Sequence, residues 1–321
     1  MENVYSDALE AVLRDLCTPA DVRAIEAGAS PAPLWDALQQ SGFADSLLPD
    51  AGLALADALP MLVTMGQYAL PVPLAQTMFA RAVLQAAGVP LPDGPIALAS
   101  REGAARAHVA DGATAAWFLV QQDGAASLVA RDAAAVQATG VHGDLTVSIG
   151  ECGGQAFALA PGTLRTMGAA LHSALLAGAM ARTFDLTLQY ANDRAQFGRN
   201  IGKFQAIQHQ ISVMAEQVAA VRMAAQIACA ADGWQPERMR AAIGKCNASE
   251  AVAAVSAIAH AVHGALGITA EYDLQLFTRR LHAWRLADGS ERYWAREIGA
   301  AVCDAQGGTV DQIRQWAGEA A

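Results

Sequence analysis

Four long helical patterns follow Pro161 and constrain this chain more than any other feature. They occupy residues 164–197, 204–231, 236–264 and 272–286, where apolar residues recur at helical spacing with few breaks. At about 1.5 Å per residue, the longest would extend roughly 40 to 50 Å. Helices of that length bury their apolar faces best against one another, so the pattern predicts an antiparallel four-helix bundle.

The first ninety residues also read as helices, but shorter ones. We expect a helix over residues 7–16 capped by Ser6, a second that starts at Pro19 after the cap residue Thr18, and a third that starts at Pro33 and ends at Gly42. One or two more lie within residues 53–87, broken around Pro71 and Pro73. This part of the chain is predicted to form a small helical domain.

The pattern changes between residues 94 and 161. Short runs suited to strands lie at residues 95–100, 116–121, 127–131 and 145–149, separated by the turn pairs Asp123-Gly124 and Gly143-Asp144. We expect a few antiparallel strands in a small sheet. The predicted fold class is therefore mainly α with a small β domain: an N-terminal helical domain (1–93), a reduced β domain (94–161) and a C-terminal four-helix bundle (162–321).

Charge and composition exclude some classes of function. With 21 basic and 31 acidic residues the net charge is −10, which disfavours a protein that tracks nucleic-acid phosphates. Charged residues make up only 16% of the chain, against about 25% in a typical domain, which favours burial of surface between subunits. Residues 58–80 and 251–270 lack formal charge, but prolines and histidines interrupt them, so we interpret both as internal helices and expect no membrane association.

The cysteines show no paired spacing for a zinc site or a disulfide framework; they are Cys17, Cys152, Cys229, Cys246 and Cys303. The N-terminal residues carry acids and lack the basic start and apolar run of a signal peptide. We therefore expect reduced thiols and a cytoplasmic location.

Three ordered motifs lie in the predicted bundle. Residues 190–198 and 204–208 read Y-A-N-D-R-A-Q-F-G and F-Q-A-I-Q, residues 262–272 contain a glycine-rich turn, and residues 286–292 read L-A-D-G-S-E-R. Together they resemble, in kind and spacing, the signature segments of the acyl-CoA dehydrogenase family. The family's order of domains, helical then β then helical, is the order expected here.

The resemblance implies FAD-dependent α,β-dehydrogenation of an acyl-CoA thioester, in which a carboxylate removes the α-proton and the flavin accepts a hydride. It also implies a tetramer, an electron-transfer acceptor and a cofactor shared between subunits. The positions that would contact FAD are Arg194, Gln196, Phe197, Gln208, Gly264, Gly267 and Ser290. Arg194 is the cation suited to the pyrophosphate.

Asp288 falls where many family members carry a catalytic Glu, and it is one methylene shorter. It is either a working base or a turn or cap residue beside Gly289 with no catalytic duty. Other members place the base on the helix before the Tyr-x-x-x-Arg segment, but that position falls near Gly168, with no carboxylate between Arg165 and Arg182. Asp288 is thus the only acid that the motifs offer.

Other departures bear on whether the chain acts alone. Ala261 stands where the family has a Gln that contacts FAD, Ala265 replaces a glycine, and residues 97–110 lack the T-E-P…G-S-D segment that lines the flavin. The chain resembles subunits of bacterial heteromeric dehydrogenases that act on bulky, often steroid-derived CoA thioesters. Three readings stay open: a subunit of such a heteromer, a non-catalytic partner that completes the oligomer and the flavin site of a second chain, and an independent homo-oligomeric enzyme.

The histidines offer little further chemistry. His260 and His263 are three residues apart on one helix, but without a third ligand we expect no metal site. His172 and His282 are interpreted as core or surface histidines. No nucleophile elbow or phosphate-binding loop is present, so hydrolase and NTPase functions lack support.

Overall fold

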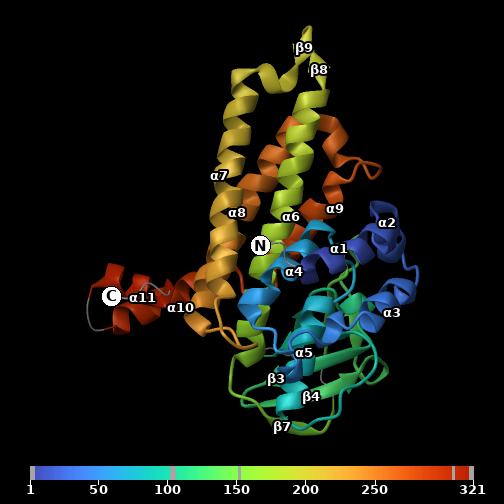
Figure 1. The fold of residues 1–321 in the computed structure, drawn as a ribbon, viewed down its shortest axis with the longest axis vertical. Coiled ribbons are helices and arrows are strands. Elements are labelled where there is room, and N and C mark those ends of the chain that lie inside the picture. The colour runs from blue at the N-terminus through green and yellow to red at the C-terminus, as the bar shows by residue number, and fades with distance from the viewer. Residues whose placement is uncertain (1–3, 102–105, 151–152, 306–307, 318–321) are drawn as a thin grey trace.

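A computed structural model describes residues 4–101, 106–150, 153–305 and 308–317 of the chain. Its helices are α1 (Val4–Leu16), α2 (Pro19–Glu26), α3 (Ala32–Gln40), α4 (Leu55–Gln67), α5 (Leu74–Ala86), α6 (Thr163–Asp193), α7 (Gln205–Ala228), α8 (Arg238–His263), α9 (Leu274–Leu286), α10 (Glu291–Asp304) and α11 (Thr309–Ala317). The fold is mainly helical with a small β region, which confirms the predicted class (Figure 1).

The N-terminal helices start close to the expected positions. Thr18 caps α2 in a capping box with Asp21, and Gly42, with φ of 78°, follows the end of α3, as predicted. The cap assigned to Ser6 is wrong: α1 begins earlier, and the Ser6 hydroxyl lies 2.9 Å from that of Thr64 on α4. The tertiary contact with α4 thus uses the side chain that was expected to cap.

The strands of the middle region are β1 (Ile96–Ser100), β2 (Ala107–Val109), β3 (Trp117–Gln122), β4 (Ala125–Ala130), β5 (Val136–Ala138), β6 (Val147–Ile149) and β7 (Ala156–Ala158). They form two sheets, in the orders β1-β3-β4-β7 and β2-β6-β5. The expectation of wholly antiparallel pairing is wrong for β1 and β3, which pair in parallel. The chain between them passes through β2 in the other sheet, which lets it return in the same direction.

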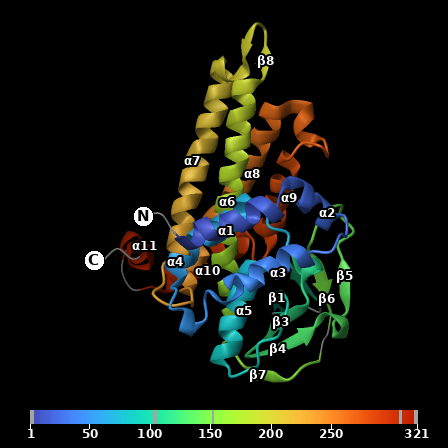
Figure 2. The ribbon, with the colours of Figure 1, turned by 45° about the vertical axis from the view of Figure 1, so that its right-hand side comes forward.

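The C-terminal helices form an elongated bundle in which α6 runs nearly the full length of the molecule (Figures 1 and 2). α6 packs against α4, α7, α8 and α9, and one apolar core joins the bundle to the N-terminal helices. Gly66 on α4 and Gly178 on α6 allow close approach, because a Cβ at either position would overlap a backbone carbonyl of the other helix. The bundle is thereby fixed against the N-terminal part.

Two ends of the bundle differ in surroundings. At one end, the loop after α6 forms a small hairpin of β8 (Ala195–Gln196) and β9 (Arg199–Asn200) that projects beyond the helices (Figure 1). At the other end, α6 starts beside the sheets, and α10 and α11, which follow the four predicted long helices, extend to the side (Figures 1 and 2).

The two charge-free stretches fall in different parts of the helical structure. Residues 58–80 are divided between α4 and α5. Within the described chain, one helical stretch, Arg238–Ile268, is long and apolar enough to cross a membrane, a property that it shares with core helices of globular proteins. It packs against α6, α7, α9 and α10, which is the arrangement of a bundle helix.

Candidate functional site

The residues predicted to form one site gather at opposite ends of α6. Arg194 follows the last residue of this helix, whereas Asp288 lies against Gly168 near its start. At 1.5 Å per residue the two positions are roughly 40 Å apart. A single compact site within one chain cannot use both.

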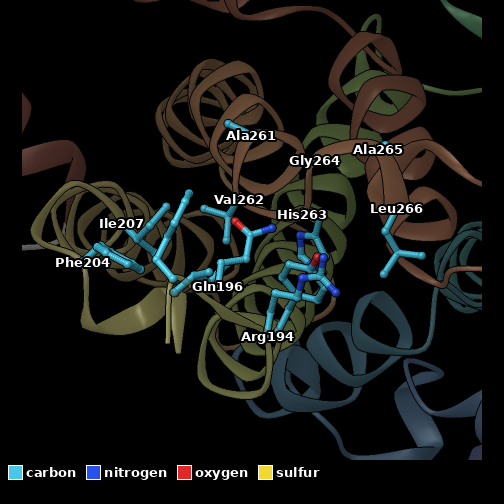
Figure 3. Close-up of a pocket in the computed structure, with 13 residues that line it drawn as sticks. Arg194, Gln196, Phe204, Ile207, Ala261, Val262, His263, Gly264, Ala265 and Leu266 are labelled. Carbon is cyan, nitrogen blue, oxygen red and sulfur yellow. The ribbon is translucent and has the colours of Figure 1, made fainter. Parts of the chain in front are cut away.

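A pocket of about 630 Å³ lies at the hairpin end, within the usual range for small-molecule sites. Its lining comes from α6, the hairpin, the start of α7 and the turn after α8: Tyr190, Arg194, Gln196, Phe197, Ile201, Phe204, Ile207 and residues 261–266. Figure 3 shows the polar side chains of Arg194, Gln196 and His263 grouped together, with Phe204 and Ile207 on one side and Leu266 on the other.

The pocket carries an unneutralised positive charge. Arg194 is exposed, and its guanidinium has no hydrogen-bond or ion-pair partner in the part of the chain that the structure describes. His263 stacks on Tyr190 with ring centroids 4.5 Å apart, and burial lowers its pKa, so it stays neutral near pH 7. Arg194 is therefore placed to bind an anionic group.

The backbone around this pocket is also open to a ligand. Gly264 has φ of 58°, lines the pocket, and a Cβ built there would meet no atom within 4 Å. Phe197, at the hairpin turn, has φ of 53° and a side chain that is 91% exposed. The ring of Phe197 is therefore accessible for contact with a ligand.

The remaining predicted cofactor contacts do not line this pocket. Gln208 donates its side-chain amide to the Gly202 carbonyl at 3.0 Å. Gly267 is turned into the protein, where a Cβ would lie 2.8 Å from the Cβ of His263. Ser290 is the N-cap residue of α10 and lies at the far end of the molecule, beside Asp288.

Asp288 lies at that far end, in the turn between α9 and α10. Its side chain is 14% exposed, and its Oδ2 lies 3.0 Å from Nδ1 of the buried His172 on α6. A Cβ on Gly168 would overlap the Asp288 carboxyl carbon. The two alternative base positions of the family, near residues 168 and 288, therefore meet at one point in this structure.

Asp288 does not cap α10, since Ser290 holds that position. It does occupy a turn, with φ of 53° before Gly289 at 104°. Trp294 Nε1 donates to the Asp288 carbonyl at 3.1 Å. The turn is thus well defined and directs the carboxylate at α6.

Lys245 on α8 binds the backbone of the same turn. It is fully buried, and its Nζ donates to Ser249 Oγ and the Arg285 carbonyl at 2.8 Å and to the Gly289 carbonyl at 3.1 Å. Burial lowers its pKa to about 7, while the nearby charges of Asp288 and Glu291 act in the opposite sense.

A second carboxyl group lies near His172. Asp111 is buried at the edge of the β region and accepts a hydrogen bond from Trp284 Nε1 at 3.1 Å. Burial raises its pKa, whereas Arg280 and His172 act in the opposite sense. His172 therefore lies near two carboxyl groups, those of Asp288 and Asp111.

The sequence did not reveal His172 or Lys245 as partners of Asp288. His172 looked like a lone core histidine, and it is buried, but it also contacts a carboxylate more than a hundred residues away in sequence. His260 lies 3.1 Å from the Thr278 hydroxyl, and no three His, Cys, Asp or Glu side chains gather as metal ligands among the described residues. Four cysteines are described and all are free; Cys152 lies outside the described residues.

The chain belongs to the acyl-CoA dehydrogenase family. The family model for the acyl-CoA dehydrogenase C-terminal domain matches residues 157–303, which include α6 to α9 and all but the last residue of α10. Over 313 residues the chain is 31% identical to acyl-CoA dehydrogenase IpdE2 of Mycolicibacterium smegmatis, covering 92% of this chain and 97% of that protein.

Solved structures agree on the fold. The chain is similar to one in the ChsE4-ChsE5 complex from Mycobacterium tuberculosis, with a TM-score of 0.80, 21% identity, and 96% and 99% of the two chains covered. It is also similar to one in the Tcur3481-Tcur3483 steroid ACAD, with a TM-score of 0.80, 22% identity, and 94% and 98% covered. Both neighbours carry two subunit names.

Proposed function

We propose that this chain is one subunit of a hetero-oligomeric, FAD-dependent acyl-CoA dehydrogenase that acts on a bulky, steroid-derived CoA thioester. The observation that carries the proposal is the division of the site along α6: a cationic pocket at Arg194, and a carboxylate at Asp288 roughly 40 Å away. Such a division suits a cofactor whose two halves contact different subunits. The relative IpdE2 and the two-subunit neighbours support a second dehydrogenase-like chain.

The pocket at Arg194 fits the pyrophosphate part of FAD. An unpaired guanidinium supplies charge-assisted hydrogen bonds, Gly264 allows close approach of backbone, and the exposed Phe197 offers an apolar face. When bound, FAD supplies the hydride acceptor.

At the other end, Asp288 would accept the α-proton of the thioester. His172 engages Oδ2, and Oδ1 accepts no hydrogen bond from the described residues, so Oδ1 is the oxygen able to take the proton. Lys245 and Trp294 fix the turn that carries it.

A second candidate function is a supporting subunit that completes the flavin site of its partner and holds no base of its own. It is favoured by Ala261 and Ala265, which line the pocket with small side chains where the family has cofactor contacts. In this function, the contact of the Asp288 carboxylate with His172 would be structural only.

Spectroscopy of the purified protein separates these functions. We expect the full chain, alone or with the chain that copurifies with it, to hold oxidised flavin and to be bleached without oxygen by a bile-acid CoA thioester more readily than by octanoyl-CoA. Absence of bound flavin in both preparations would overturn the proposal. Bleaching by neither thioester in a flavin-loaded assembly would reject the proposed reaction.

A further inference from the structure

The contact between His172 and Asp288 fixes which nitrogen of the imidazole carries a proton. Nδ1 lies 2.8 Å from the Gly168 carbonyl and 3.0 Å from Asp288 Oδ2. A carbonyl oxygen and an ionised carboxylate can only accept hydrogen bonds, so Nδ1 must be the donor. Nε2, which is buried, has no hydrogen-bond partner among the described residues.

This donor is well held. His172 is 1% exposed on α6, and its bond to the Gly168 carbonyl spans one turn of the helix. Gly168 also leaves the space above the helix that the Asp288 carboxyl group fills. The carboxylate therefore rests on the backbone of α6 and against a rigid imidazole.

The backbone of Asp288 is held separately. Lys245 binds the carbonyls of Arg285 and Gly289 on either side of it, and Trp294 binds its own carbonyl. These contacts fix where the side chain starts but not where the carboxylate points. Within the described structure, the polar contact of the carboxylate is with His172, whose Nδ1 lies 3.0 Å from Oδ2 while its N–H is hydrogen-bonded to the Gly168 carbonyl.

We propose that His172 is a positioning residue for Asp288: its Nδ1–H, which is bonded to the Gly168 carbonyl, also attracts Oδ2 at 3.0 Å and so presents Oδ1 to the α-carbon of the thioester. The proposal rests on the proposed function. It explains how an Asp, one methylene shorter than the Glu expected at this position, keeps a single orientation. A misplacement of about 1 Å in a reacting group costs on the order of a hundredfold in rate, so the orientation matters for chemistry more than for folding.

The first test compares three variants of the flavin-loaded assembly. His172→Leu keeps bulk and removes the donor, His172→Asn places an amide N–H near the position of Nδ1–H, and Ser173→Ala removes a neighbouring buried bond to the Ala169 carbonyl as a control. We expect His172→Leu to lower the limiting rate of flavin reduction by a bile-acid CoA about tenfold or more, with half-saturation within about twofold.

His172→Asn is expected to recover most of the wild-type rate of flavin reduction, and Ser173→Ala to retain that rate. Equal rates for His172→Leu and wild type, in an assembly that Asp288→Asn inactivates, would overturn the positioning role and leave the proposed function intact. Full activity of Asp288→Asn would overturn both the base and its positioning residue. A drop in rate that His172→Asn does not rescue, matched by Ser173→Ala, would show a structural effect only.

The second test needs no turnover. In protein labelled with nitrogen-15 histidine, we expect His172 to show the tautomer protonated at Nδ1, and Asp288→Asn to shift its Nδ1 resonance while Ser173→Ala does not. If Asp288→Asn leaves the Nδ1 resonance unchanged, the two side chains are not in contact and the proposal fails. This outcome can be read even from an assembly that does not reduce an acyl-CoA.

Discussion

The two ends of α6 differ in whether their polar side chains have partners within the chain. At the start of the helix, Asp288 and Lys245 contact polar groups of α6, α8, α9 and α10. At its end, Arg194 has no partner in the described chain, and Phe197 is 91% exposed. A solvent-exposed guanidinium is free to bind an anionic ligand, whereas most polar groups around Asp288 already have partners in this chain, with His172 Nε2 as an exception. Under the proposed function, the difference teaches that the end with Asp288 is built by this chain itself, and we expect the end with Arg194 to be completed by a cofactor and a neighbouring subunit.

The largest expected effect tests the complete end. Asp288→Asn keeps the shape of the side chain and removes the base, so we expect flavin reduction by an acyl-CoA to fall at least about a hundredfold, a typical size for a general base. Bound FAD and the oligomeric state should not change, as absorbance and light scattering can verify. Reduction at the wild-type rate would place the base on a partner subunit and make this chain the supporting half.

Gly168→Ala tests whether the carboxylate of Asp288 needs the space that Gly168 leaves on α6. The added Cβ overlaps the Asp288 carboxyl carbon, so the carboxylate must move away from His172 and the rate of flavin reduction should fall about tenfold to a hundredfold. Gly299→Ala on α10, where a Cβ would meet no atom within 4 Å, is the matched control and should leave the rate unchanged. A fully active Gly168→Ala variant would mean that Asp288 points elsewhere in the working enzyme.

Arg194→Ala tests the open end. Loss of a charge-assisted hydrogen bond, about 1.5 to 3 kcal/mol, should weaken FAD binding roughly tenfold to 150-fold without changing the fold. Arg222→Ala removes an exposed cation of α7 outside this pocket and should have no effect on flavin affinity. Equal affinities for Arg194→Ala and Arg222→Ala, measured by fluorescence titration of the apoprotein, would exclude a cofactor role for the pocket.

Lys245 tests stability rather than binding or catalysis. In the native state it loses its proton near pH 7, whereas in the unfolded chain it keeps it up to about pH 10.5. Between these values the unfolded state binds more protons, so the contribution of Lys245 to the free energy of unfolding rises with pH.

The variant Lys245→Met removes this contribution. Its free energy of unfolding should rise less steeply than that of the wild type between pH 7 and about pH 10, by up to about 1.4 kcal/mol per pH unit. Denaturant titrations across that range measure the difference. Parallel pH profiles for the two proteins would mean that Lys245 does not lose its proton near pH 7 in the native state.

The sequence predicted the helices well because their apolar period persists over many turns, as in α6 and α8. It did not predict the parallel pairing of β1 with β3, because a strand's partner depends on where the intervening chain passes. Asp288 could be found because it lies within a motif. His172, Gly168 and Lys245 could not be connected with it, since their proximity arises only when α6, α8 and the turn after α9 pack together.

The central claim is that the two ends of α6 serve different cofactor sites, and a structure of the FAD-loaded assembly by electron cryomicroscopy tests it most directly. We predict that the FAD whose pyrophosphate contacts Arg194 of this chain places its flavin ring in another subunit, and that this ring does not contact Asp288 of the same chain. A flavin ring beside Asp288 on an FAD that also contacts Arg194 of that chain, or protein in place of FAD in the pocket, would contradict the account.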